Sequence, residues 1–264
     1  MTNALIGYSG FVGSTLLKQC PFTDQYRSTN IADSNGKDFN LVVCTAAPAQ
    51  KWIANREPEA DLQNIELLIA HLRTITCKTF VLISTVDVFK SPLDVNEETP
   101  VDENGLHPYG LHRRLLEKFV EKQFTNHLII RLPGLVGPGL RKNVIYDFLN
   151  KNNLDAIESR GIFQFYPMIN LWYDIQVALN AGINLVHLTA EPISVAEIST
   201  AGFGKSFNQT LTNPPARYDL QSKYAALFGG QGLYQYNKRE TIQAVRAYAQ
   251  SETVTIKIEG GVTL

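Results

Sequence analysis

Short apolar runs without polar alternation recur along the chain and restrict its fold more than any other feature. These runs are residues 4–6, 41–44, 80–83 and 128–130. Strands of this kind are buried on both faces, which is typical of a parallel sheet covered by helices. Segments with apolar residues at helical spacing, residues 61–72 and 109–124, lie between and beside them. The alternation predicts an α/β fold with a Rossmann-type, doubly wound parallel sheet.

Composition and charge exclude several other classes of protein. The chain has 264 residues, 44% of them hydrophobic and 19% charged, which is enough for a large core and unlike a disordered chain. Its 24 basic and 25 acidic residues give a net charge of −1, so no overall charge favours nucleic acid or an anionic membrane. Three scattered cysteines and five unpaired histidines indicate neither a disulfide framework nor a metal site. We expect no signal peptide, no membrane span and a cytoplasmic location.

A glycine-rich turn follows the first apolar run and precedes a helical pattern. Gly7, Gly10 and Gly13 stand three residues apart. Glycine permits the tight turn and lets the backbone approach a pyrophosphate, while the following helix N-terminus offers free N–H groups. This context favours a dinucleotide-binding loop. The residues we expect to contact the cofactor here are Gly7, Ser9, Gly10, Phe11, Val12 and Gly13.

After about residue 135 the pattern becomes irregular, with turn-rich and aromatic-rich stretches, a short helix expected at residues 141–149 and a helix expected near residues 239–248. The simplest arrangement is a small C-terminal substrate-binding cap over the carboxyl edge of the sheet. We assign residues 1–135 and 173–200 to the dinucleotide-binding domain. The cap then comprises residues 136–172 and 201–264.

Several further segments follow the glycine loop in a fixed order that is more specific than the glycine spacing alone. They are Thr45-Ala46-Ala47, Asn64, Ser84-Thr85 with Phe89, Pro108-Tyr109-Gly110, and the stretch from Arg131 through Pro133 to Gly139. Together they resemble the extended short-chain dehydrogenase/reductase family, of the NAD-dependent epimerase/dehydratase type. The resemblance implies that residues 45–47, Ser84 and Pro133 lie along the dinucleotide, and that Asn64 is the family's structural Asn.

The resemblance also implies a catalytic triad, with one departure. Tyr109 would be the acid/base and Thr85 would orient the substrate oxygen. The family carries a Lys four residues after the Tyr, where its charge favours the phenolate, but this sequence has Arg113. Arginine keeps the charge, although its planar fork donates in fixed directions. We expect Thr85, Tyr109 and Arg113 to form the catalytic group.

The residues after Thr85 bear on the type of reaction. The family's sugar-nucleotide dehydratases carry an Asp-Glu pair there, whereas this sequence has Val86 and Asp87. Valine has no proton to give, which disfavours a dehydratase. The run over residues 84–89 is most similar to the 4-keto-sugar reductases of the dTDP-rhamnose type.

The sequence leaves the choice between NAD and NADP open. Asp33 lies about 20 residues beyond the glycine loop, where an acidic residue binds the ribose of NAD. Arg27 with Ser28 could instead receive the 2′-phosphate of NADP. Beyond Gly139, Arg141 and Lys142 are candidates to bind a substrate diphosphate.

Taken together, the residues and the resemblance predict an NAD(P)-dependent oxidoreductase or epimerase that acts on a nucleotide-activated sugar by hydride transfer. The alternative is a dinucleotide-binding sensor or partner protein with weak or no turnover, because Arg113 replaces the usual Lys. The resemblance further implies a homodimer in which the helices at residues 61–72 and 109–124 form a four-helix bundle with those of the second subunit.

Overall fold

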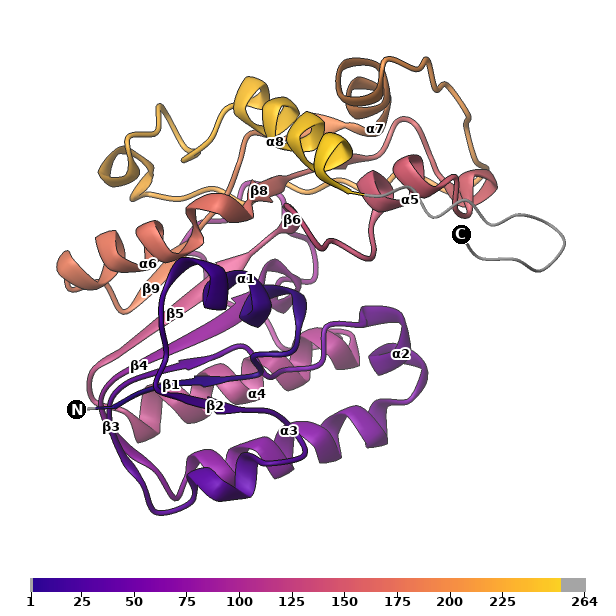
Figure 1. The fold of residues 1–264 in the computed structure, drawn as a ribbon. Coiled ribbons are helices and arrows are strands. Elements are labelled where there is room, and N and C mark those ends of the chain that lie inside the picture. The colour runs from indigo at the N-terminus through magenta and orange to yellow at the C-terminus, as the bar shows by residue number, and fades with distance from the viewer. Residues whose placement is uncertain (1, 253–264) are drawn as a thin grey trace, which may run out of the picture.

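The computed structural model describes residues 2–252, which form a parallel sheet with helices on both faces and a second layer made by later residues (Figure 1). The sheet has six strands in the order β2-β1-β3-β4-β5-β9, and every neighbouring pair is parallel. This arrangement confirms the predicted Rossmann-type α/β fold. The strands are β1 (Asn3–Ile6), β2 (Asp24–Tyr26), β3 (Asp38–Cys44), β4 (Thr76–Thr85), β5 (His127–Leu132) and β9 (Leu185–His187).

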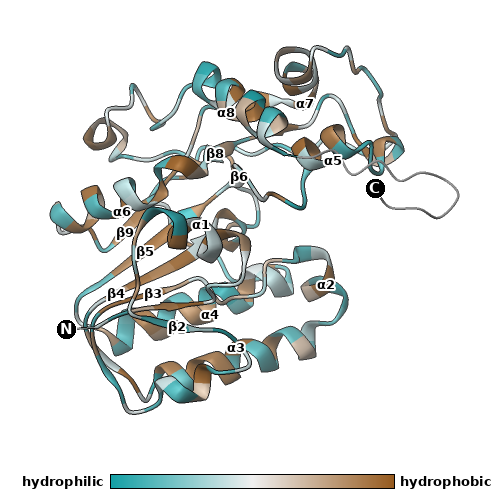
Figure 2. Cartoon of the chain, in the orientation of Figure 1, coloured by the Kyte–Doolittle hydropathy of each residue, from teal (hydrophilic) through white to brown (hydrophobic). Residues whose placement is uncertain are grey.

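Helices cover the two faces of the sheet (Figure 1). Successive strand residues alternate between these faces. Ile6 and Val42 pack against α3 and α4, whereas Leu5 and Val43 pack against α1 and α6. Both faces are therefore buried, which explains the uniformly apolar strands, drawn largely in brown in Figure 2. The helices of this layer are α1 (Phe11–Gln19), α2 (Lys51–Arg56), α3 (Pro58–Leu72), α4 (Pro108–Gln123) and α6 (Leu171–Asn180).

A second layer lies on the side of α1 and α6, away from α3 and α4 (Figure 1). It contains two small sheets, of which one pairs β6 with β8 in parallel and the other pairs β7 with β10 antiparallel. Its elements are β6 (Gly134–Val136), α5 (Val144–Asn150), β7 (Ile162–Phe163), β8 (Phe165–Pro167), β10 (Ile193–Ser194), α7 (Val195–Glu197) and α8 (Lys238–Ser251).

The second layer has its own apolar cluster, which includes Val136, Phe165, Ile193 and Val245. Residues 193–200, which we expected with the main sheet, therefore pack in this layer because β10 pairs with β7. Residues 253–264 of the expected cap lie outside the described residues. The division into two domains otherwise stays a prediction.

Short single turns connect the longer elements. Five are 3₁₀ turns and one, η5, is π-helical. They are η1 (Ile31–Ser34), η2 (Val86–Val88), η3 (Leu154–Ala156), η4 (Met168–Asn170), η5 (Ile198–Gly202) and η6 (Ala225–Phe228).

A buried carboxyl joins the two layers. Asp174 of α6 accepts hydrogen bonds from the hydroxyls of Tyr166 of β8, at 2.5 Å, and of Tyr236, at 2.8 Å. Asp174 is 1% exposed, and this burial raises the pKa of its carboxyl to about 6, even though the two hydroxyls act to lower it.

Candidate active site

The glycine loop lies at the carboxyl end of β1 and depends on two glycines that have no room for a side chain. Gly7 has a φ of +90°, and a Cβ there would lie 2.7 Å from the backbone nitrogen of Ala46. A Cβ at Gly13 would lie 2.3 Å from the Gly7 carbonyl oxygen. Gly10 precedes α1, whose first turn has no acidic residue and no side-chain cap. The loop thus leaves a cradle beside free N–H groups, which fits a dinucleotide pyrophosphate.

Thr45, directly after β3, fixes this loop from the neighbouring strand. Its hydroxyl lies 3.1 Å from the carbonyl oxygens of both Ile6 and Gly7 and donates to them, and its N–H donates to Ile6 at 2.8 Å. Ala46 and Ala47 continue along the same edge and are half-buried. The resemblance placed residues 45–47 beside the cofactor, and the structure brings them against the glycine loop.

The end of β2 lies next to the glycine loop and carries Arg27. The Gly7 N–H donates to the Tyr26 carbonyl at 2.7 Å, and the Arg27 guanidinium carbon lies 5.9 Å from the ring centre of Tyr8. Asp33, in contrast, lies in η1 and is exposed. Of the three residues considered for cofactor choice, Asp33, Arg27 and Ser28, Arg27 is the one with a recorded contact to the loop, at Tyr8.

Thr85 and Tyr109 come together at the carboxyl end of β4. The Thr85 hydroxyl oxygen accepts the Asp87 N–H at 3.1 Å, and this hydroxyl acts to lower the pKa of the Tyr109 phenol. Tyr109 lies in the first turn of α4, where the Tyr109 N–H donates to Asn55 of α2 at 3.0 Å. A Cβ at Gly110 would lie 2.1 Å from the Asp87 carbonyl oxygen, so glycine permits this close approach of α4 to η2.

The Tyr109 side chain is 8% exposed, and burial is the main reason that the pKa of its phenol is raised. The Asp87 carboxylate raises this pKa further, while Arg113, the Thr85 hydroxyl and Lys51 lower it. At neutral pH the Tyr109 phenol is therefore protonated. A buried, protonated phenol can donate a proton to an oxygen of a bound substrate.

Arg113 lies one turn after Tyr109 but does not approach the phenol hydroxyl. Its guanidinium carbon lies 4.0 Å from the centre of the Tyr109 ring, over the ring face. It forms a buried ion pair with Asp61, with one contact at 2.9 Å, and it donates to the Pro48 carbonyl. His112 donates to the same carboxylate at 2.7 Å. Arg113 is thus paired with Asp61, and its charge, which we expected to favour the phenolate, acts to lower the pKa of the Tyr109 phenol from over the ring.

Ser84 and Pro133 occupy the ends of neighbouring strands. The Ser84 hydroxyl donates to Glu117 at 2.6 Å, and Glu117, fully buried in α4, also forms an ion pair with Arg131 at 2.7 Å. Pro133 directly follows β5 and is buried. The sequence gives no local indication of this Glu117 network, because its members lie on three different elements.

The two candidate cations for a substrate diphosphate, Arg141 and Lys142, are both exposed residues. The Lys142 ammonium donates to the Ala49 carbonyl, and its partial burial lowers its pKa, with Arg113 adding to that effect and Asp87 opposing it. Lys142 therefore lies within electrostatic range of the Asp87 and Arg113 side chains beside Tyr109.

Three residues near Tyr109 were missed by the sequence analysis, namely Lys51, Asn55 and Tyr218. Lys51 and Asn55 are four residues apart on α2, which places them on one helix face and is the only signal that could have linked them. Asn64, the expected structural Asn, is exposed, and Asn55 is the residue that holds the Tyr109 N–H.

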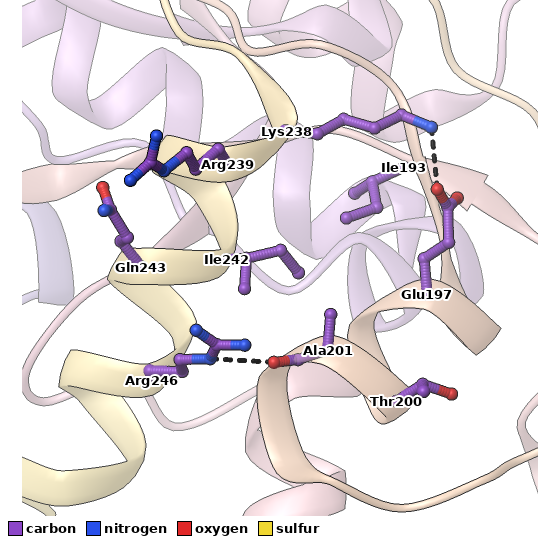
Figure 3. Close-up of a pocket in the computed structure, with 9 residues that line it drawn as sticks. All are labelled: Ile193, Glu197, Thr200, Ala201, Lys238, Arg239, Ile242, Gln243 and Arg246. Atoms are coloured by element: carbon purple, nitrogen blue, oxygen red, sulfur yellow. Dashed lines mark hydrogen bonds and ion pairs between the residues drawn. The ribbon is translucent and has the colours of Figure 1, made fainter.

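A separate hollow lies in the second layer, between α8 and η5 (Figure 3). Lys238 forms an ion pair there with Glu197 at 2.9 Å, and Arg246 donates to the Ala201 carbonyl at 2.9 Å. None of the predicted site residues lines it.

Two searches of the described residues found nothing. Over residues 2–252, no group of three or more His, Cys, Asp or Glu side chains is placed to hold a metal ion. Within the same residues no helix is both long enough and apolar enough to cross a membrane.

Comparison with known proteins shows a likeness of fold. No family model matches the sequence, and no curated protein matches it. Among solved structures, the chain is similar to the dTDP-4-dehydrorhamnose reductase of Yersinia enterocolitica, with a TM-score of 0.71, 15% identity, and coverage of 95% of this chain and 99% of that one. It is also similar to a UDP-glucose 4-epimerase of Thermotoga maritima solved with UDP-glucose, with a TM-score of 0.69, 14% identity, and coverage of 95% and 98%.

A third similar structure is RMD from Pseudomonas aeruginosa complexed with NADPH, with a TM-score of 0.69, 17% identity, and coverage of 96% of this chain and 100% of that one. At these identities the likeness establishes the fold, which is the fold expected from the resemblance in sequence.

Proposed function

We propose that this protein is an NAD(P)-dependent oxidoreductase or epimerase that acts on a nucleotide-activated sugar, and that it favours the reduction of a carbonyl group. The observation that carries the proposal is the Thr85–Tyr109 hydroxyl pair at the same sheet edge as the glycine cradle. When bound there, a reduced nicotinamide supplies hydride to a carbonyl carbon. Similar folds that act on dTDP- and UDP-sugars support the substrate class.

The roles of the chain's own residues follow from their geometry. Thr85 orients the substrate oxygen, and Tyr109 donates its phenolic proton to that oxygen as the alcohol forms. The raised pKa of Tyr109 keeps this proton in place at neutral pH, which suits reduction better than a reaction that starts from the phenolate. Lys142 binds the substrate's phosphates by exchanging its contact with the Ala49 carbonyl for them.

The proposal also includes the choice of cofactor and the state of assembly. Arg27, next to the glycine loop, favours NADP over NAD, whereas Asp33 is exposed in η1. The resemblance in sequence suggests a homodimer through α3 and α4, and Leu67 of α3, whose side chain is 60% exposed, would lie in that interface.

Tyr109→Phe tests the proposal, because it removes only the proton donor. We expect the rate of NADPH-dependent reduction, measured on a panel of dTDP- and UDP-linked 4-keto-sugars, to fall about 10²- to 10⁴-fold. Cofactor affinity, measured by nicotinamide fluorescence, should stay unchanged because the cradle is intact. The unmodified protein should keep its rate through neutral pH and lose it only above the ordinary tyrosine range, since the pKa of Tyr109 is raised.

A dinucleotide-binding sensor or partner protein is the second candidate. The pairing of Arg113 with Asp61 favours it, because the usual cation beside the phenol is then compensated. Cofactor binding with no reduction of any sugar in the panel would select this candidate over the first.

A further inference from the structure

Arg113 lowers the pKa of the Tyr109 phenol, but it acts from over the ring face and not beside the hydroxyl, where a Lys would lie. It is 2% exposed, the Asp61 carboxylate compensates its charge, and its guanidinium lies over the ring face at 4.0 Å from the centroid. If Tyr109 is a proton donor, the other charged groups around it tune its proton affinity as well.

A second set of polar side chains lies directly beside Thr85. One carboxylate oxygen of Asp87 accepts from the Lys51 ammonium at 2.7 Å and from the Tyr218 hydroxyl at 3.2 Å. Lys51 and Tyr218 are themselves 3.4 Å apart. The Asp87 side chain is 16% exposed, so its charge is only partly screened by water.

This set packs against the turn that carries Tyr109. Asn55, one turn after Lys51 on α2, accepts the Tyr109 N–H. The Asp87 backbone meets α4 at Gly110, and the Asp87 N–H donates to the Thr85 hydroxyl, which acts on the pKa of the phenol. The three side chains therefore belong to the immediate surroundings of the phenol, although they come from three distant parts of the chain.

We propose that Lys51, Asp87 and Tyr218 form a positioning unit that, together with Arg113, sets the proton affinity of the Tyr109 phenol. The inference rests on the proposed function, which makes Tyr109 the proton donor. The Asp87 carboxylate favours the protonated phenol, Lys51 opposes it, and the Tyr218 hydroxyl disperses the Asp87 charge. Because Tyr218 follows the second-layer elements β6 to β10 in the chain, the later part of the chain takes part in the chemistry.

The electrostatic effects on Tyr109 agree with this assignment. After burial, Arg113 lowers the pKa of the phenol, Asp87 raises it, and Thr85 and Lys51 lower it further. Burial, with Lys51 adding to it, lowers the pKa of His107, so its ring, 6.3 Å from that of Tyr109, is neutral at pH 7. The remaining charged groups of this region are Arg113 on α4, its partner Asp61 on α3, and Lys142.

The test measures the proton affinity of position 109 without substrate. A fluorinated tyrosine, whose phenol ionises nearer neutral pH, replaces Tyr109 in the full chain, and its fluorine NMR signal is followed against pH. We expect Lys51→Met to raise the pKa of this phenol by about one unit and Asp87→Asn to lower it by a similar amount. The double variant should return close to the parent value, because both charges are gone.

Two further variants make the result specific. Lys238→Met removes a lysine whose side chain is about as exposed as that of Lys51 (42% against 37%) and which also pairs with a carboxylate, in the second layer. This variant should leave the pKa of the phenol at position 109 unchanged. Tyr218→Phe should raise the pKa, but less than Lys51→Met. The proposal is overturned if the single variants leave the pKa of the phenol unchanged, or if they shift this pKa no more than Lys238→Met does. Since no turnover is measured, this failure is distinguishable from an absence of reductase activity.

Discussion

A single buried ion pair determines what Arg113 does. Asp61 is 5% exposed and holds both Arg113 and His112, whose hydrogen bonds lower the pKa of its carboxyl although burial acts to raise it. The pair ties α4 to α3 and, through Pro48, to the loop after β3. Arg113 is therefore a positioning residue in our proposal.

Arg113→Ala should destabilise the fold strongly, because it leaves the Asp61 charge buried without its main partner. We expect the free energy of unfolding, measured by urea denaturation, to fall by about 3–5 kcal/mol. Arg56→Ala is the matched control, since its pair with Glu57 is exposed on both sides and should contribute little. Equal losses in the two variants would contradict the structural role.

Arg27 offers a test of cofactor choice at the same scale. If its guanidinium binds the 2′-phosphate of NADP, Arg27→Ala should weaken NADPH binding about tenfold or more, because a charge-assisted hydrogen bond is lost. NADH has no such phosphate, so its affinity should hardly change. Fluorescence titration with both cofactors measures the difference, and a parallel loss for both would assign Arg27 to the loop's structure alone.

Sequence reasoning could find Thr85 and Tyr109 because each lies in a local motif with a recognisable neighbourhood. It could not find the partners that act through space. Lys51 and Asp87 are 36 positions apart, and Tyr218 and Asp87 are 131 apart. Similarly, nothing around Arg113 indicated that Asp61, 52 positions away, would compensate its charge. Helical spacing predicted that Arg113 lies one turn after Tyr109 on the same helix face. Its contact with Asp61 depends on how α4 packs against α3.

At the scale of elements, the apolar runs predicted the central strands because burial on both faces leaves a strong signal. β2 shows no such apolar run in the sequence, because it is a three-residue edge strand in which only Tyr26 is buried. The helix expected at residues 141–149 begins later, at Val144, because Asn143 caps it by accepting the Ile145 N–H at 2.9 Å.

The junction between β1 and α1 depends on close backbone contact, and Gly13→Ala tests it. Its Cβ would meet the Gly7 carbonyl oxygen at 2.3 Å, so the loop or the helix must shift. We expect a loss of roughly 1–3 kcal/mol in the free energy of unfolding. Gly10→Ala is the control for stability, because its Cβ would lie at 3.5 Å from the same oxygen, an ordinary contact. A fully stable Gly13→Ala protein would show that the loop can relax freely.

At the scale of the whole molecule, Asp174 links the two layers, and its ionisation makes the stability of the folded protein depend on pH. Its folded-state pKa of about 6 lies above the ordinary value of 3.8, so the native state binds the proton more tightly than the unfolded chain. The stability that this proton contributes is present below about pH 4 and is lost as the pH rises through 6.

Asp174→Asn should abolish this dependence, because an amide still accepts from Tyr166 and Tyr236 but does not ionise. We expect the unmodified protein to lose roughly 1–3 kcal/mol more than the variant between about pH 4 and pH 7. Urea denaturation of both proteins across this range gives the difference, in which the titration of all other carboxylates cancels. Parallel curves would show that Asp174 is ionised throughout.

The link between Tyr218 and Asp87 has a consequence for the order in which the protein matures during synthesis. Five of the six central strands are complete once residue 132 has left the ribosome, and the glycine cradle with them. The unit around Asp87 stays open until the segment holding Tyr218 has emerged. In the proposed function, a nascent chain can thus form its nucleotide-binding loop well before Tyr109 is surrounded by the groups that set its proton affinity. Cofactor binding can therefore precede catalytic activity during synthesis.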